Sequence, residues 1–455
     1  MSGFPSSSLL DETLRIVTRR YRLPALAAIS DQVQSANSAT RLAIAIELAR
    51  QALARGEVPD VELQRLFTDA LARMIQEAMR PEQGDPVFQA MVLRHLNTQV
   101  REYASLSAHT GQDRRAVHAA VNGIAHPAKQ RQIHPGRQRD VLNRVHTLAA
   151  SASWSALADT VRDFLNAPEI ADDPSLARLL DNPALARLQR LEALASDELV
   201  RQYQSLWDRN GPRPGSDTAA AHGSASRQRG AAVEALAAQA LDALARRLNE
   251  TEGPQVTYRA VTSMRVPASI PASPERAKSE WDVVLLSSAP PVDSTAVWDI
   301  CLLVEAKASV DAATTDLPRL LRGLRLLGHA KEDVVYSFET QEGTVRLRGT
   351  SLRALPTDEA DLASTVLYCC DAAAETSPRL LSAASRMQLL SAPASLEFAS
   401  KLAEQQHVDT QCLEAVWHQL LESPRWRAVL HQYPMLRQAR ELMVHTEDLS
   451  AAIDG

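Results

Sequence analysis

The stretch ICLLVEAK, residues 300–307, decides how this chain is expected to fold. Its first five residues carry only apolar or thiol side chains, which is typical of a central strand covered on both faces. Glu305 and Lys307 follow two residues apart, and the period of two in a strand places their side chains on one face, about 7 Å apart. Charged groups at the end of a buried strand cost desolvation free energy unless they are paired or bind a metal. The stretch therefore predicts a buried strand that ends in a charged site.

Short β-rich runs lie on both sides of this strand along the chain. The predicted strands are Val256–Val266, Trp281–Leu286, Trp298–Ala306, Val334–Phe338, Thr344–Arg348 and Thr365–Cys370. An Ala-rich helix at about 226–248 precedes them, because Ala and Leu are strong helix formers. A second helix at about 317–330 interrupts them, with Asp316 placed to cap it and Pro318 in its first turn. This order predicts a mixed α/β domain, an α+β arrangement.

Helical regions flank the mixed domain on both sides. Apolar residues at helical spacing, such as Leu10, Leu14 and Val17, predict an all-helical N-terminal region. A stretch rich in Gly, Pro, Ser and Ala then breaks every apolar period and predicts a linker. The predicted segments are the helical domain 1–207, the linker 208–225, the α/β domain 226–372 and the helical C-terminal region 373–455.

Composition and charge exclude several classes of protein. Hydrophobic residues make up 45% of the 455 residues and charged residues 23%, which excludes wholesale disorder. The formal net charge of −6 disfavours a basic nucleic-acid coat, so any contact with nucleic acid needs a local patch. The four cysteines form no CxxC pair and are expected to be buried thiols in a reducing compartment. Neither a signal peptide nor a membrane span is indicated, so we expect a cytoplasmic protein that does not bind membranes.

Asp282 on one predicted strand and Glu305-x-Lys307 on the next resemble the PD-(D/E)XK phosphodiesterase superfamily, which has the restriction-endonuclease-like fold. The resemblance covers residues 226–370, about one third of the chain. It implies a mixed-sheet core of helix, three strands, helix and strand. Trp281 stands where the family has a proline before the aspartate.

By this resemblance, Asp282 and Glu305 would hold Mg²⁺ or Mn²⁺, and Lys307 would lie beside the attacking water. Glu234, on the Ala-rich helix, would assist as a further metal ligand. The chemistry fits, since carboxylates favour these ions. A metal activates water and offsets charge at the phosphate, and a lysine adds positive charge there.

Further residues complete the expected site. Arg319 or Arg322, on the helix that follows, would meet a substrate phosphate. Asp299 is a rival carboxylate, but it lies at the start of the Glu305 strand, whereas Asp282 is expected to end the preceding strand. Asp282 is therefore the preferred metal ligand.

A basic segment at 109–146 offers a second candidate surface. It carries five histidines and seven Lys or Arg residues against two aspartates, a local charge of +5. The segment is interpreted either as a phosphate-contacting patch or as the solvated face of an Arg-rich helical region. Zinc is not expected there, because no cysteine lies nearby and the histidine spacing matches no common ligand pattern.

The sequence thus predicts a metal-dependent nuclease that cleaves DNA rather than RNA. Two alternatives stay open for the charged residues: the same fold without activity, and a Glu–Lys pair at a strand end with no catalytic role. In a non-enzymatic alternative, the helical regions form a protein-interaction scaffold around an inactive core. Bacterial defence, interbacterial competition and DNA repair would all suit the nuclease, and the helical regions could bind a protein partner.

Overall fold

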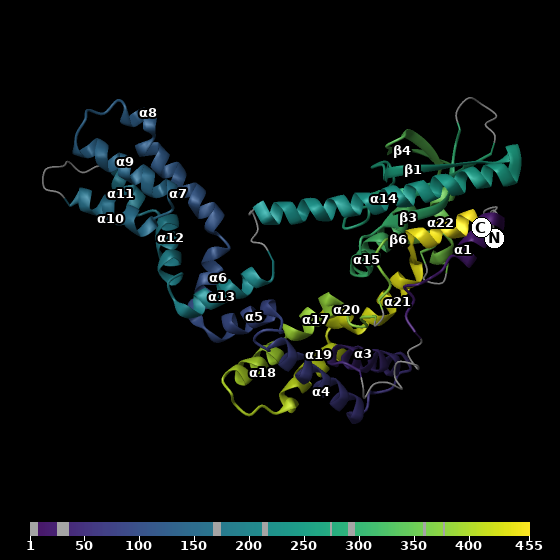
Figure 1. The fold of residues 1–455 in the computed structure, drawn as a ribbon, viewed down its shortest axis with the longest axis horizontal. Helices are drawn as coiled ribbons and strands as arrows, with labels where there is room; N and C mark the ends of the chain where they lie inside the picture. Colours follow the sequence, from purple (N-terminus) through teal and green to yellow (C-terminus); the bar gives the residue numbers. More distant parts are fainter. Residues whose placement is uncertain are drawn as a thin grey trace. The chain divides into compact units, whose positions relative to one another are not determined.

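The chain forms two compact units, each assembled from segments that are distant in the sequence (Figure 1). One unit contains residues 1–74, 215–389 and 413–455, and the other contains 75–214 and 390–412. The fold is that of a computed structural model, which describes residues 8–24, 36–166, 174–211, 217–273, 275–289, 296–357, 361–375 and 378–455.

A seven-stranded mixed sheet forms the centre of the first unit. Its strand order is β5-β4-β1-β2-β3-β6-β7. The strands are β1 (Thr257–Arg265), β2 (Glu280–Ser288), β3 (Asp299–Ala306), β4 (Val335–Thr340), β5 (Gly343–Arg348), β6 (Val366–Cys370) and β7 (Met443–His445). Strands β1, β2 and β3 pair antiparallel, whereas β6 pairs parallel with both β3 and β7. The expected mixed α/β architecture is therefore present, with helices flanking an open sheet.

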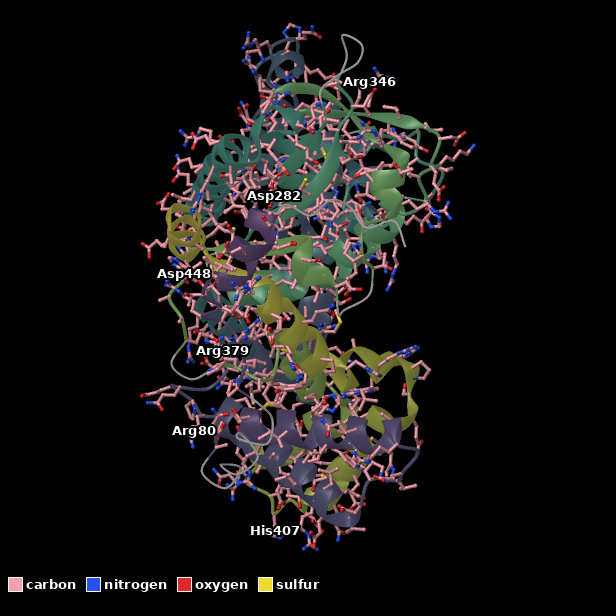
Figure 2. All side chains as sticks on the ribbon, turned by 90° about the vertical axis from the view of Figure 1, so that its right-hand side faces the viewer. Arg80, Asp282, Arg346, Arg379, His407 and Asp448 are labelled. Atoms are coloured by element: carbon pink, nitrogen blue, oxygen red, sulfur yellow. The ribbon has the colours of Figure 1, made fainter. Side chains whose placement is uncertain are left out.

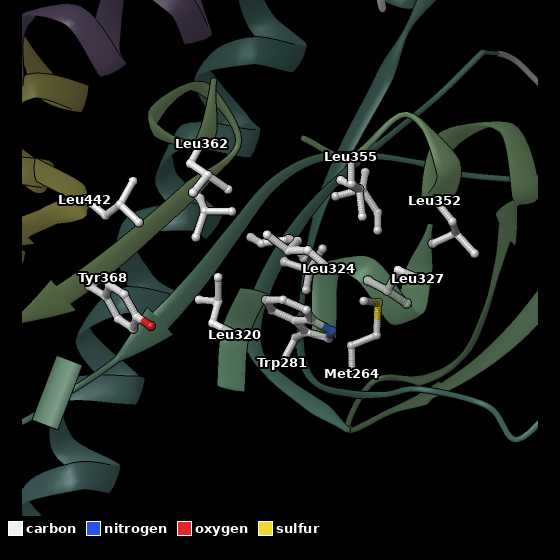
Figure 3. Packing of buried hydrophobic residues seen from close by; sticks show 14 of the residues in the cluster. Met264, Trp281, Leu320, Leu324, Leu327, Leu352, Leu355, Leu362, Tyr368 and Leu442 are labelled. Carbon is white, nitrogen blue, oxygen red and sulfur yellow. The ribbon is translucent and has the colours of Figure 1, made fainter. Parts of the chain in front are cut away.

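The two faces of the sheet bury two separate hydrophobic cores. On one face, α1 (Ser8–Ile16), α14 (Asp217–Glu252) and α22 (Thr446–Asp454) cover side chains such as Val283 and Val304. On the other, α15 (Val310–Leu327) and α21 (Gln432–Leu442) cover side chains such as Trp281 and Leu303 (Figure 3). Alternate residues of each strand point to opposite faces, so one strand contributes to both cores.

The C-terminal tail differs from the uniform helix that its sequence predicts. Strand β7 interrupts residues 376–446, the region expected to be helical. A strand of three residues is too short to show a period of two, and it is defined by pairing with β6. Together with α21 and α22, it joins the tail to the sheet.

The two units divide the chain between residues 214 and 215, inside the predicted linker 208–225, but the unit that holds the sheet also takes in both chain ends. The linker prediction differs in part, since α14 already begins at Asp217. The alanines in the second half of the predicted linker favour helix, so α14 extends into it. Residues 212–216 of that linker lie outside the described residues.

Helix α15 begins earlier than its sequence predicts. Ser309 caps it, with its side-chain oxygen accepting a hydrogen bond from the Ala312 N–H at 3.2 Å. Asp316 is therefore not the cap, and Pro318 lies inside the helix rather than in its first turn. The earlier start leaves Asp316 on a helical face, where it can meet the sheet.

The remaining helices are divided between the two units. In the first unit they are α3 (Ser38–Ala54), α16 (Gly349–Arg353), α19 (Glu414–Glu422) and α20 (Arg427–Leu430), with α4 (Val61–Ala78) and α17 (Ala383–Leu390) ending just beyond it. The second unit consists of α5 (Pro86–Leu96), α6 (Thr98–Ser107), α7 (Thr110–Ala125), α8 (Pro127–Gln130), α9 (Arg137–Ala150), α10 (Trp154–Leu165), α11 (Pro174–Leu180), α12 (Pro183–Leu194), α13 (Glu198–Arg209) and α18 (Pro393–Ala403). Among the helices of the described residues, none has the length and apolarity that crossing a bilayer requires.

The cysteines are free thiols, in agreement with the absence of a disulfide framework. Cys369 and Cys370 point into opposite cores, as their neighbouring positions on a strand require. The expectation that every thiol is buried is wrong for Cys301 and Cys412, which are half-buried.

Gly323 controls how closely α15 approaches the segment before β2. A Cβ at this position would lie 2.8 Å from the Lys278 Cβ and 3.3 Å from the Trp281 Cζ2. We expect Gly323→Ala to lower the free energy of unfolding by about 1–3 kcal/mol through overpacking, although alanine favours helix. Gly230→Ala in α14, where nothing lies within 4 Å, should instead stabilise by up to about 1 kcal/mol. Urea unfolding followed by circular dichroism tests this difference, and equal gains for both variants would contradict it.

Candidate active site

The charged residues of the sheet meet where β2 begins and β3 ends. The expectation that Asp282 ends its strand is wrong, since β2 runs from Glu280 to Ser288 and Asp282 lies near its start. Because β2 and β3 are antiparallel, with Val283 opposite Val304, the start of β2 lies beside the end of β3. Asp282 (labelled in Figure 2) therefore lies next to Glu305 despite the different position in its strand.

The two carboxyl groups occupy different environments. Glu305 is fully buried, whereas the side chain of Asp282 is 23% exposed. The Ala306 N–H donates a hydrogen bond of 2.9 Å to Asp282 Oδ2, which fixes this carboxylate against the end of β3. Asp282 can thus contact solvent while Glu305 depends on its protein partners.

Lys307 connects these carboxyl groups with a third one. Its Nζ lies 3.1 Å from Glu305 Oε2, 3.8 Å from Asp282 Oδ2 and 3.6 Å from Asp316 Oδ2. The backbone holds the residue in place, because the Lys307 N–H donates to the Cys369 carbonyl at 2.9 Å and continues the pairing of β3 with β6. The structure therefore brings the three principal predicted residues, Asp282, Glu305 and Lys307, into one cluster.

Lys278 supplies a second ammonium group to this cluster. It is not among the site residues that the sequence predicts. Its Nζ lies 2.5 Å from Glu305 Oε2 and 3.8 Å from Asp282 Oδ1, and its side chain is only 5% exposed. Lys278 precedes β2 and belongs to no periodic pattern that would have drawn attention to it. The rarity of lysine in this chain was the sequence feature that could have indicated Lys278 as a site residue. The chain has five lysines, and two of them lie in this cluster.

Asp316 and Tyr368 complete the cluster from α15 and β6. The Tyr368 hydroxyl donates to Asp316 Oδ2 at 3.2 Å, and Tyr368 pairs with Glu305 in the register of β6 and β3. Burial raises the pKa of Tyr368, and Asp316 adds to this effect. Figure 3 shows Tyr368 of β6 and Leu320 of α15 among the buried side chains of one hydrophobic core. Asp316 was missed because the sequence placed it at a helix cap.

The charges of the cluster do not balance when every group is ionised. Two ammonium groups, Lys278 and Lys307, face three carboxyl groups, Asp282, Glu305 and Asp316. Burial, and after it the charge of Asp282, raise the pKa of Glu305 to about 8 against the opposing effect of the two lysines. Burial lowers the pKa of Lys307, but Glu305 and Asp282 outweigh this and raise it overall. A bound cation would offset the excess negative charge.

The other predicted site residues lie outside this set of ion pairs. Glu234 is half-buried on α14, and its pKa is raised first by burial and then by Asp282 and Glu280. The charge of the site therefore affects its pKa. Among the described residues, however, none of the ion pairs of the cluster includes Glu234. Arg319 and Arg322 are exposed on α15, where Arg322 Nε donates to the Arg276 carbonyl at 2.8 Å.

Asp299 belongs to a different part of the sheet. It lies opposite Ser287 at the other end of the β2–β3 pair and forms an ion pair with Arg348. The rival carboxylate is therefore separated from Glu305 by most of the length of β3, and the preference for Asp282 as the neighbour of Glu305 agrees with this geometry.

A divalent cation fits this site in its donor chemistry. Glu305 Oε1 is buried, and no donor of the described residues bonds to it, although Oε2 contacts both lysines. No group of three His, Cys, Asp or Glu side chains suited to a metal occurs within the described ranges. Mg²⁺ does not need one, because proteins usually hold it by one or two carboxylates plus water and substrate phosphate. Asp282 and Glu305 can supply that pair.

The raised pKa of Glu305 predicts how stability changes with pH. The folded chain keeps a proton on Glu305 between about pH 4.5 and about pH 8, where the unfolded chain has lost it. The contribution of this group to the free energy of unfolding therefore falls as the pH rises through that interval. We expect Glu305→Gln to remove this decrease in the free energy of unfolding. Glu332→Gln, which changes an exposed carboxylate, should leave the decrease as it is in the parent chain. Urea midpoints across this range test the prediction, and parallel profiles for Glu305→Gln and the parent chain would contradict it.

Comparisons of the chain with protein-family models, curated proteins and solved structures found no match. The candidate site at the end of β3 is therefore defined by its geometry and charge alone.

Proposed function

We propose that this chain is a metal-dependent nuclease that hydrolyses phosphodiester bonds, in DNA rather than RNA. The observation that carries the proposal is that Lys307 Nζ lies within 3.8 Å of carboxylate oxygens of both Asp282 and Glu305. This is the combination that the PD-(D/E)XK resemblance implies for metal ligands and the adjacent lysine. The order α14, β1, β2, β3 and α15, followed after the inserted β4, β5 and α16 by β6 parallel to β3, also supports the resemblance.

Each residue has a role that follows from its position. Asp282 and Glu305 would hold Mg²⁺ or Mn²⁺, which lowers the pKa of bound water and offsets charge at the phosphate. Lys307 would donate to the attacking water or to a phosphate oxygen, because its three N–H groups reach several partners from one point. Tyr368 keeps Asp316 beside Lys307, and this arrangement favours the charged ammonium. Glu234 would adjust the charge of the site from α14.

Affinity for nucleic acid would come from two places: the part of the chain that forms the sheet, and the helical segment 109–146. Residues 223–370 contain 16 basic and 19 acidic residues, so this part of the chain has no general attraction for phosphate. Exposed Arg319 and Arg322 provide positive charge on α15, the helix whose Asp316 contacts Lys307. The basic segment 109–146 presents further exposed cations, namely Arg114, Arg115, Lys129, Arg131, Arg137 and Arg144. We propose this segment as the phosphate-contacting patch of the helical unit.

The proposal predicts DNA cleavage that needs both the metal and the cluster. With Mg²⁺ or Mn²⁺, the purified chain should cleave plasmid or single-stranded DNA, and a chelator should stop it. Asp282→Asn and Lys307→Met should each lower the rate by at least about 100-fold, because each removes charge from the transition state. Asp299→Asn and Lys331→Met are matched controls outside the cluster and should keep the parent rate.

Two results would overturn the proposal. One is the absence of cleavage with every metal and nucleic acid, which would favour a non-enzymatic scaffold in which the cluster is structural. The other is cleavage that is unaffected by Asp282→Asn and Lys307→Met, which would place the chemistry elsewhere.

A further inference from the structure

Lys278 stands out as a buried cation that the proposed nuclease chemistry does not use. Lysine is almost never fully buried unless it is paired, because removing its charge from water is costly. Here the ammonium contacts Glu305 Oε2 at 2.5 Å and Asp282 Oδ1 at 3.8 Å, the same two carboxyl groups that would hold a metal. Its contact with Glu305 is shorter than the 3.1 Å contact of Lys307.

The surroundings hold Lys278 in this position from several sides. Its backbone N–H donates to the Arg319 carbonyl of α15 at 3.3 Å. Gly323, one turn further along α15, has no Cβ where one would lie 2.8 Å from the Lys278 Cβ. The ammonium also lies 5.8 Å from the centroid of the Trp281 ring, within the range of a cation–π interaction. The fold therefore directs this side chain toward the carboxyl groups.

A divalent cation and this ammonium need the same oxygens. Two ammonium groups already share Glu305 Oε2, while Oε1 has no partner within the described part of the chain. A divalent cation bound by Asp282 and Glu305 would stand close to both lysines, and like charges at such distances repel strongly in a buried site. Lys307 could keep Asp316 as a partner, whereas Lys278 has ion pairs only with the two metal-binding carboxyl groups in the structure as described.

We propose that Lys278 is an internal counter-ion that competes with the divalent cation for Asp282 and Glu305. The ammonium neutralises the carboxyl groups in the metal-free protein and has to leave them when the metal binds. The affinity for the metal is therefore lower than the two carboxyl groups alone would give. This inference rests on the proposed function, because it takes Asp282 and Glu305 as the metal ligands.

Titration of the full-length chain with Mn²⁺, followed by the loss of free-ion signal in electron paramagnetic resonance, tests the competition without an activity assay. Lys278→Met keeps the length of the side chain but removes its charge, and should bind Mn²⁺ at least about tenfold more tightly. Lys278→Arg keeps a cation and should remain near the parent affinity. Lys331→Met, at an exposed lysine away from the cluster, should leave the affinity unchanged. Circular dichroism checks that each variant is folded, and Lys278→Gln replaces Lys278→Met if that variant is not.

The outcomes separate this inference from the proposed function. Equal or weaker Mn²⁺ binding by Lys278→Met would overturn the competition while leaving the metal site intact. Binding by Lys278→Met but not by the parent chain would support the competition and count against a metal-dependent nuclease in the parent. No binding by any variant, or binding that persists when Asp282→Asn and Glu305→Gln are combined with Lys278→Met, would overturn both.

Discussion

Glu305 lies fully buried at the end of the central strand β3, and the burial of its carboxyl group governs how the residues around it are arranged. A fully buried carboxyl group needs compensation, and its two ion-pair partners, Lys278 and Lys307, come from the segment before β2 and from the end of β3. Networks of buried charges rarely stabilise a protein more than apolar packing would, and removing one partner typically costs about 3–5 kcal/mol. Stability alone therefore gives little reason to keep such a cluster. Within the described residues, no donor bonds to Glu305 Oε1, and the proposed metal site would supply a partner for this oxygen.

The topology of the sheet turns separate sequence positions into neighbours. The antiparallel pairing of β2 with β3 brings Asp282 beside Glu305, and the parallel pairing of β3 with β6 brings Tyr368 to the same place. Helix α15 then adds Asp316, and its close approach at Gly323 helps to hold Lys278. The cluster therefore depends on the packing of α15 as much as on the two strands that carry the metal-binding candidates.

Local patterns in the sequence predicted those parts of the structure that depend on local residues. The apolar run before Glu305 and the β-rich runs around it correspond to strands β1 to β6. The period of two also indicated that Glu305 and Lys307 share a face, which their ion pair confirms. The contributions of Lys278 and Asp316 could not be predicted, because they arise from tertiary packing. Neither residue belongs to a periodic pattern, and Asp316 is compatible with a helix cap until the actual cap, Ser309, is known. The three-residue strand β7 likewise exists only through its pairing with β6.

We expect Asp282 and Glu305 together to hold a divalent cation at the end of β3. Anomalous diffraction from crystals of the protein soaked in Mn²⁺ tests this expectation, because it locates the metal independently of any activity. The expected result is an anomalous peak in contact with carboxylate oxygens of both residues, with the Lys278 ammonium displaced from Glu305. A peak elsewhere, or a fully occupied Lys278–Glu305 ion pair with no peak beside it at saturating Mn²⁺, would show that these two carboxyl groups do not form the metal site.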